Sequence, residues 1–178
     1  MKIYRNIKSK SPIEFFGDWA EIGKDEGMEK GHTSSVNFMI NKILENNSSF
    51  SFIDAGCGNG WVTRLLNSNK NCDYSAGVDG AKQMIEKAKL INPSGNYFCG
   101  DLIDWIPSKK VDIVHSMEVF YYFKEPIKVF DNIYKNWLNR EGKLVFGIDH
   151  YVENKTTLNW PEECGVYMNT KSIFEWKA

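Results

Sequence analysis

The chain has 178 residues, 42% of them hydrophobic and 14% aromatic, which is enough for the core of one ordinary domain. Its 23 acidic and 22 basic side chains nearly cancel, so the net charge of -1 supplies no field that would attract nucleic acid or an anionic membrane. No apolar run has the length of a signal peptide core or of a membrane span. We therefore expect one cytoplasmic domain without a nucleic-acid or membrane partner.

Short apolar runs alternate with helical patterns along the chain. Apolar residues at helical spacing predict a helix over residues 36–44, and similar patterns predict helices over residues 81–90 and 126–138. Five runs rich in β-formers predict strands, at residues 50–54, 74–79, 96–99, 111–116 and 143–148. Strands that alternate with helices pair in parallel through right-handed crossovers. The fold class expected is a doubly wound α/β domain, a mainly parallel sheet with helices on both faces.

A glycine turn, Asp-Ala-Gly-Cys-Gly-Asn-Gly, follows the first predicted strand at residues 54–60. In a doubly wound sheet this first strand-to-helix turn is the usual ligand cradle. Its glycines have the spacing G-x-G-x-G, and Trp61 stands where the dinucleotide fingerprint G-x-G-x-x-G needs a third glycine. A NAD(P)-dependent reductase is therefore disfavoured, although one mismatch leaves it as a weaker alternative.

Two carboxylates follow the next two strands. Asp79 ends the second strand, where a carboxylate can accept hydrogen bonds from both hydroxyls of a ribose. Asp101 follows the third strand, where it can accept from an adenine amino group while Leu102 lies against the ring. Together these residues predict an adenosine site.

Four ordered motifs make the chain resemble the class I S-adenosylmethionine-dependent methyltransferases. Residues 52–60 match the first motif of that family, residues 77–88 resemble the second region, and residues 101–102 fit the third. Residues 111–122 look like the fourth motif, as found in members that methylate small molecules. The resemblance spans roughly residues 35–150. It implies S-adenosylmethionine as cofactor, S-adenosylhomocysteine as product and a small-molecule methyl acceptor.

The resemblance also implies roles for individual residues. Gly56 and Gly58 would let the backbone meet the amino acid end of the cofactor, and Asp54 would orient that turn or the cofactor ammonium. Asp79 would hold the ribose and Asp101 the adenine amino group. The complete set expected to bind the cofactor is Asp54, Gly56, Cys57, Gly58, Asp79, Gly80, Met84, Asp101, Leu102, Ser116 and Met117.

Some of these assignments have a plain structural alternative. Met84 would be a wall of the adenine slot or simply helix core, and Ser116 and Met117 would pass near the methionine part of the cofactor. Cys57 is expected to be a small wall residue, because no sequence feature places a base beside its thiol. The four cysteines form no C-x-x-C pair, so no metal site is expected.

Direct methyl transfer needs no nucleophilic side chain, but an acceptor that must lose a proton needs a general base. The candidates are His150 after the fifth strand and Tyr121 after the fourth, with His115 and Tyr122 as further possibilities. Residues 1–34 contain aromatic, glycine and charged residues suited to a lid over the acceptor, or to a docking surface.

The sheet of this family normally has seven strands, whereas only a polar loop at residues 149–169 and the start of a helix at residues 170–176 follow the fifth strand here. The methyltransferase domain, residues 35–178, is therefore expected to be C-terminally incomplete, or to be completed by another chain. An exposed sheet edge would then favour self-association. A cofactor-binding but inactive partner subunit is the alternative function.

Overall fold

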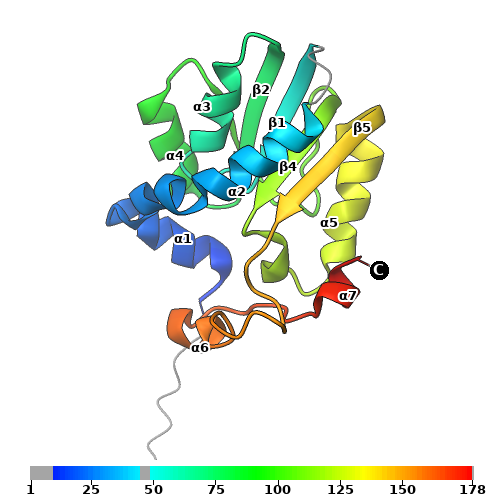
Figure 1. Cartoon of the computed structure of the whole chain (residues 1–178). Helices are drawn as coiled ribbons and strands as arrows, with labels where there is room; N and C mark the ends of the chain where they lie inside the picture. Colours follow the sequence, from blue (N-terminus) through cyan, green and yellow to red (C-terminus); the bar gives the residue numbers. More distant parts are fainter. Residues whose placement is uncertain (1–9, 45–48, 178) are drawn as a thin grey trace, which may run out of the picture.

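The computed structural model describes residues 10–44 and 49–177, which form a single parallel sheet with helices packed around it (Figure 1). The strands are β1 (Phe50–Ala55), β2 (Cys72–Asp79), β3 (Asn96–Cys99), β4 (Val111–Met117) and β5 (Leu138–Gly147). They lie in the order β3-β2-β1-β4-β5, and every neighbouring pair is parallel. Because the strand order reverses between β1 and β4, their carboxyl ends open a crevice there.

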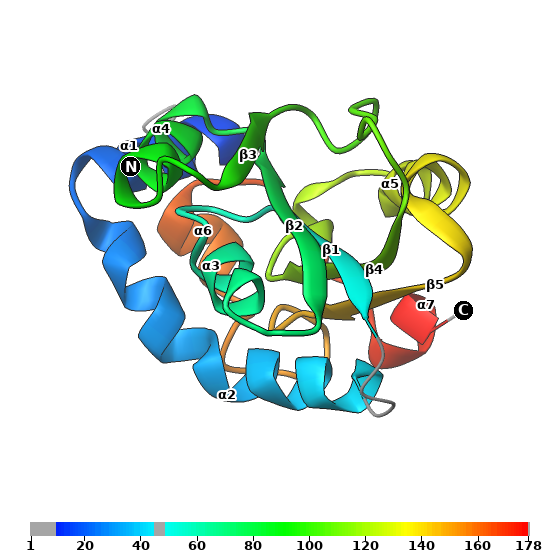
Figure 2. The same cartoon turned by 90° about the horizontal axis from the view of Figure 1, so that it is seen from above.

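Helices cover both faces of the sheet, as the sequence predicts (Figure 2). On one face, α2 (Gly27–Ile43) and α3 (Trp61–Asn67) bury a cluster that includes Met39, Leu66 and Phe52. On the other face, α5 (Pro126–Asn132) and the following π-helical turn η3 (Ile133–Trp137) bury a cluster around Ile53 and Val114. The two apolar layers hold the central strands rigidly, which fixes the positions of the residues at the strand ends.

Two helices have bounds that differ from the sequence prediction. Helix α2 begins at Gly27 rather than near residue 36, so it includes glycine and hydroxyl residues that usually mark a loop. The helix predicted over residues 126–138 divides into α5 and η3, and Leu138 already belongs to β5. Trp137 explains the wide turn, because its fully buried ring packs edge-on against Trp105 and its indole N–H donates to the Trp105 carbonyl at 2.9 Å.

Three further helices follow β2 and β5 along the chain. Helix α4 (Lys82–Ile91) agrees with its prediction. The segment predicted as a polar loop at residues 149–169 contains the short helix α6 (Trp160–Cys164), and α7 (Ile173–Lys177) follows it. Figure 1 shows α6 below α1, where the backbone of Lys10 pairs with that of Val166.

The N-terminal cap lies over the carboxyl ends of the strands. It consists of α1 (Pro12–Glu21), the 3-10 turn η1 (Lys24–Glu26) and the first turns of α2, while residues 1–9 of the predicted lid lie outside the described residues. Ser11 and Glu14 form a capping box that starts α1, and α1 packs against α4. Helix α2 continues through position 34, where the sequence suggests that the cap ends.

Two properties concern the described residues alone. None of the helices in residues 10–44 and 49–177 is both long and apolar enough to cross a membrane. Nor does any group of three or more His, Cys, Asp or Glu side chains in those ranges gather as metal ligands would.

Candidate functional site

A cavity of about 730 Å³ lies between the carboxyl ends of the strands and the cap. Helices α1 and α2, η2 (Phe120–Tyr122) and α6 contribute to its wall. Its lining includes ten of the eleven residues expected to bind the cofactor, Asp54, Gly56, Cys57, Gly58, Asp79, Gly80, Met84, Asp101, Leu102 and Met117. Ser116 is absent from the lining, because it is buried and its hydroxyl donates to the Ala55 carbonyl at 2.8 Å.

The glycine turn needs glycine for backbone reasons. Gly56, Gly58 and Gly60 have φ angles of 77°, 51° and 78°, a left-handed conformation that costs other residues roughly 1–2 kcal/mol. The backbone amides of Gly56 and Cys57 donate to the Val78 carbonyl at 2.8 and 3.0 Å, which ties the turn to β2. A β-carbon at Gly56 would collide with the Val119 side chain. The turn therefore brings bare backbone to the cavity wall.

Asp79 is held by the same turn. Its two carboxylate oxygens accept hydrogen bonds from the backbone N–H groups of Gly58, at 2.9 Å, and Ala81, at 2.8 Å. Burial raises the pKa of Asp79, and these two backbone donors partly offset that shift. A carboxylate has about four lone-pair positions, so two are left for hydroxyl donors in the cavity. This geometry fits the pair of vicinal hydroxyls expected of a ribose.

The neighbouring positions form a slot beside Asp79. Asp101 is exposed at the carboxyl end of β3, and one of its oxygens accepts from the Ile103 N–H at 3.0 Å. Leu102 and Met84 are almost fully buried and supply apolar wall. Burial raises the pKa of the Cys57 thiol well above its usual value, so the thiol stays protonated and serves as wall rather than nucleophile.

Asp54 and His115 form a buried pair at the point where the strand order reverses. They lie opposite each other on β1 and β4, and the His115 Nδ1 atom is 2.7 Å from a carboxylate oxygen of Asp54. His115 is fully buried and lines the cavity, and its Nε2 has no hydrogen-bond partner among the described residues. A carboxylate on one ring nitrogen orients the imidazole and leaves the other nitrogen for a ligand.

The two principal candidates for general base receive little support from their geometry. His150 is fully buried away from the cavity lining, and its ring nitrogens are engaged by the Thr157 carbonyl at 3.0 Å and the Thr170 hydroxyl at 2.8 Å. Tyr121 does line the cavity, but burial raises its pKa and its hydroxyl donates to Glu118 at 2.8 Å. His150 thus joins segments of the fold, and Tyr121 acts as a donor.

Glu118 is a cavity residue that sequence reasoning missed as a site. It directly follows β4, has a φ of 61°, and is the one non-glycine with positive φ within the described ranges. No sequence pattern predicts a positive φ for a glutamate. The one sequence feature that could have indicated Glu118 is its position directly after a predicted strand, because residues expected to bind the cofactor follow the other strands.

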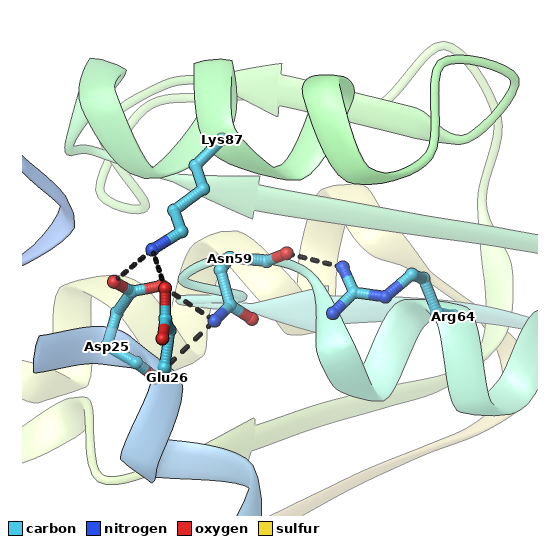
Figure 3. A network of polar contacts seen from close by, with 5 residues as sticks. All are labelled: Asp25, Glu26, Asn59, Arg64 and Lys87. Atoms are coloured by element: carbon cyan, nitrogen blue, oxygen red, sulfur yellow. Dashed lines mark hydrogen bonds and ion pairs between the residues drawn. The ribbon is translucent and has the colours of Figure 1, made fainter. Parts of the chain in front are cut away.

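A polar network ties the cap to the glycine turn (Figure 3). Asp25 of η1 is fully buried, and its carboxylate accepts from the Lys87 ammonium at 2.7 Å and from the Asn59 side-chain amide at 2.8 Å. The Asn59 carbonyl in turn accepts from the Arg64 guanidinium at 2.6 Å, and Glu26 adds a second contact to Lys87 at 3.2 Å. The cap thereby holds the turn in place as well as covering it.

Aromatic rings of the cap cover the side of the cavity that faces away from the strand ends. Phe15, Phe16 and Trp19 of α1 line it and contact one another, with ring centroids 5.2 to 5.4 Å apart. Phe16 also packs edge-on against Tyr122 at 5.3 Å, which joins the cap to η2. His32 of α2 completes this wall, and burial lowers its pKa, so its ring is neutral at neutral pH. The cavity therefore has a mainly aromatic roof over a polar floor.

Comparison with known proteins places these features in a family. Residues 53–146 match the family described as "Methyltransferase domain". Trans-aconitate 2-methyltransferase of Rhizobium rhizogenes is 30% identical over 81 residues, which cover 46% of this chain and 32% of that protein. Malonyl-[acyl-carrier protein] O-methyltransferase of Haemophilus influenzae is 24% identical over 149 residues, covering 81% of this chain and 55% of the relative. The chain thus spans about half or less of the length of these curated relatives.

Solved structures agree with this assignment. A complex between the Haloferax volcanii Trm112 methyltransferase activator and a methyltransferase contains a similar chain, with a TM-score of 0.78 and 27% identity, covering 91% of this chain and 72% of that one. A DhpI complex with SAM and HEP has a TM-score of 0.69 at 15% identity, covering 94% of this chain and 84% of that chain, which supports the fold alone.

Proposed function

Because the chain belongs to the methyltransferase domain family, the class I S-adenosylmethionine-dependent enzymes, we propose that it transfers a methyl group from S-adenosylmethionine to a small-molecule acceptor. The observation that carries this proposal is the arrangement of the cavity floor. The glycine turn, Asp79 and Asp101 follow β1, β2 and β3, which are consecutive neighbours in the sheet. The methionine, ribose and adenine parts of the cofactor would lie over β1, β2 and β3 in that order.

The residues present fit the cofactor. Asp79 keeps two acceptor positions for the ribose hydroxyls, and Met84 and Leu102 supply apolar wall for the adenine. The left-handed glycines remove side chains that would block the methionine part. When bound, the cofactor supplies a methyl group on a positively charged sulfur that is open to direct in-line displacement.

The chain's own contribution is to align the reactants and exclude water. The aromatic roof formed by Phe15, Phe16 and Trp19 would cover the acceptor and keep solvent out. Where the acceptor must lose a proton, we assign that role to His115, because Asp54 orients its ring and its Nε2 is unpartnered. Tyr121 remains a cavity wall that donates rather than accepts.

The first test is a calorimetric titration with S-adenosylhomocysteine, with NADH as the competing candidate ligand. We expect binding heat and a thermal shift with S-adenosylhomocysteine and neither with NADH, because Trp61 occupies the place of the third glycine in the dinucleotide-binding fingerprint. Folded protein that binds NADH in preference would overturn the proposal in favour of the reductase. Transfer of a labelled methyl group to trans-aconitate, the substrate named for one relative, then tests the acceptor class.

A protein partner is a second component of the proposal. The similar chain in the Haloferax volcanii complex is solved together with an activator protein. Here the edge strand β3 has only four residues and exposes Phe98, with the exposed Ile103 and Ile106 shortly after it. An apolar edge of this kind suits pairing with another chain, an activator or a second copy. Light scattering of the purified protein alone distinguishes self-association from a requirement for an activator. A cofactor-binding subunit without activity of its own would bind S-adenosylhomocysteine but transfer no methyl group.

A further inference from the structure

Glu118 is held in an unfavourable backbone conformation at the edge of the cavity. Its φ of 61° costs a non-glycine residue energy, and its backbone N–H is fixed by a 2.9 Å hydrogen bond to the Gly147 carbonyl at the end of β5. Strain of this kind persists where the surrounding structure keeps a side chain in a particular place. The side chain kept here is a carboxylate that lines the cavity.

Within residues 10–44 and 49–177, no ion pair involves the Glu118 carboxylate. One oxygen, Oε2, accepts from the Tyr121 hydroxyl at 2.8 Å, whereas Oε1 is buried and receives no hydrogen bond of ordinary geometry from the described residues. The two lysines of the cavity rim are engaged elsewhere, Lys128 with Glu125 and Lys124 over the Tyr167 ring.

Burial dominates the titration of this group and raises the pKa of Glu118 to about 8. The Tyr121 hydroxyl lowers it, the Asp149 carboxylate raises it and the Asp149 backbone amide lowers it slightly. Other titratable groups of the cavity lining include Tyr122, also protonated because burial raises its pKa, and the neutral His32. The carboxylates of Asp54, Glu125 and Glu163 line the same cavity. A cation placed beside a buried carboxylate favours its ionised form and so lowers its pKa.

The strand order locates Glu118 relative to the expected ligands. Asp101, Asp79 and the glycine turn follow β3, β2 and β1, and Glu118 follows β4, the next strand in the sheet. The cavity therefore runs from the adenosine end to Glu118, beyond which the aromatic side chains of η2 and α1 begin. With the cofactor placed as proposed above, Glu118 would lie where its reactive end meets the acceptor.

We propose that Glu118 is the anionic wall of an organic-cation subsite at the point of methyl transfer, with Tyr121, Tyr122 and Phe16 as its aromatic walls. This inference rests on the proposed function. Aromatic faces attract organic cations, and no arginine is found among the described residues that line the cavity, so the surroundings favour a positive occupant. Two sources supply such a charge, the methyl-bearing sulfonium of the cofactor and a protonated amine as the acceptor.

The test compares cations with neutral counterparts in two matched pairs. The first pair is S-adenosylmethionine and S-adenosylhomocysteine. The second pair is phenethylamine and 2-phenylethanol, which are titrated into protein saturated with S-adenosylhomocysteine. At about pH 8.5 the wild type should prefer the cation of at least one pair by about 10- to 100-fold, as expected for a charge-assisted contact. Glu118→Gln, which keeps the shape and removes the charge, should abolish that preference.

A pH series provides a readout that a structural role would not move. Glu118 is mostly protonated at neutral pH, and a bound cation lowers its pKa, so binding should release protons to the buffer. The ratio of wild-type to Glu118→Gln affinity for the cation should rise about tenfold between about pH 7 and pH 9 and approach unity at lower pH. Calorimetry in buffers of different ionisation enthalpy measures the released protons directly.

Glu86→Gln is the matched control, because Glu86 is exposed on α4 and its one ion pair within the described part of the chain is with Lys82. It should leave both ligand preferences and the proton release unchanged. The affected pair identifies the source of the charge, cofactor or acceptor. Equal preferences in the wild type and Glu118→Gln for both pairs would overturn the subsite. If S-adenosylhomocysteine bound neither the wild type nor any variant, the proposed function would instead be refuted. Phenethylamine and 2-phenylethanol, titrated without S-adenosylhomocysteine, would still test the subsite.

Discussion

Replacement of Asp79 by alanine separates the two tasks that its carboxylate performs. In the protein alone, the carboxylate accepts from the backbone N–H groups of Gly58 and Ala81 at 2.9 and 2.8 Å. With the cofactor bound, its remaining lone pairs would accept from the ribose hydroxyls. Asp79→Ala should therefore weaken the glycine turn and the ligand contact together.

The magnitudes follow from these contacts. Hydrogen bonds to a charged group contribute about 1.5 to 3 kcal/mol each, so the loss of two ribose contacts, about 3 to 6 kcal/mol together, should lower the affinity by about 10²-fold to 10⁴-fold. Water in the cavity can replace the carboxylate at the two backbone donors, so the loss of folding stability should be smaller, about 1 to 2 kcal/mol. For a chain of this size that corresponds to a melting temperature lower by roughly 2 to 8 °C.

The assay pairs a thermal melt without ligand with a titration of S-adenosylhomocysteine on folded protein. Asp101→Ala serves as the comparison, because Asp101 is exposed and one of its oxygens already caps the Ile103 N–H. It should cost less affinity than Asp79→Ala. Wild-type affinity in a folded Asp79→Ala protein would show that the ribose is not bound where we place it.

Three further changes test other parts of the site. Gly58→Ala places a side chain at a φ of 51° and 3.1 Å from the Met28 methyl carbon, so it should lower both the melting temperature and the affinity of the folded fraction for S-adenosylhomocysteine. Gly31→Ala, in open space inside α2, should leave that affinity unchanged and raise the melting temperature slightly. Asp25→Ala leaves the Lys87 ammonium without its buried partner and should cost about 1 to 3 kcal/mol in urea unfolding; an unchanged midpoint would contradict the role of the network. Glu118→Gln should stabilise the ligand-free protein relative to wild type progressively as pH rises from about 4.5 to 8, because the folded state keeps a proton on Glu118 that the unfolded state loses; a difference in melting temperature that is independent of pH would refute this.

The parts of the fold that the sequence predicts are those determined by local patterns. Each of the five predicted strands overlaps an observed strand, although β5 begins at Leu138 rather than at residue 143. Burial on both faces explains the continuous apolar run of β1, Phe50–Ala55. The start of α2 could not be read, because Gly27, Gly31 and Thr33 resemble loop residues. What carries the helix through them is tertiary, namely the contacts of its apolar face with α3 and β5 and the anchoring of η1 at Asp25.

The candidate site likewise contains residues that the sequence indicates and residues that it does not. The residues carried by an ordered motif, such as Gly58 and Asp79, line the cavity, and their role in binding the cofactor stays a prediction. His150 does not line the cavity, because its two nitrogen partners come from segments that only the folded chain brings together. Glu118 was missed for a related reason, since its position depends on a backbone angle that no residue type signals.

The network around Asp25 also bears on how the chain can be divided. A cut at position 34 would interrupt α2 in its middle and remove the carboxylate that satisfies the Asn59 amide and the Lys87 ammonium. The excised segment would take with it the cap side of the cavity, including Met28, whose methyl carbon approaches the glycine turn. We therefore expect the cap and the sheet to unfold as one cooperative unit, so an expression fragment that starts at residue 35 should be less soluble and more easily proteolysed than the whole chain.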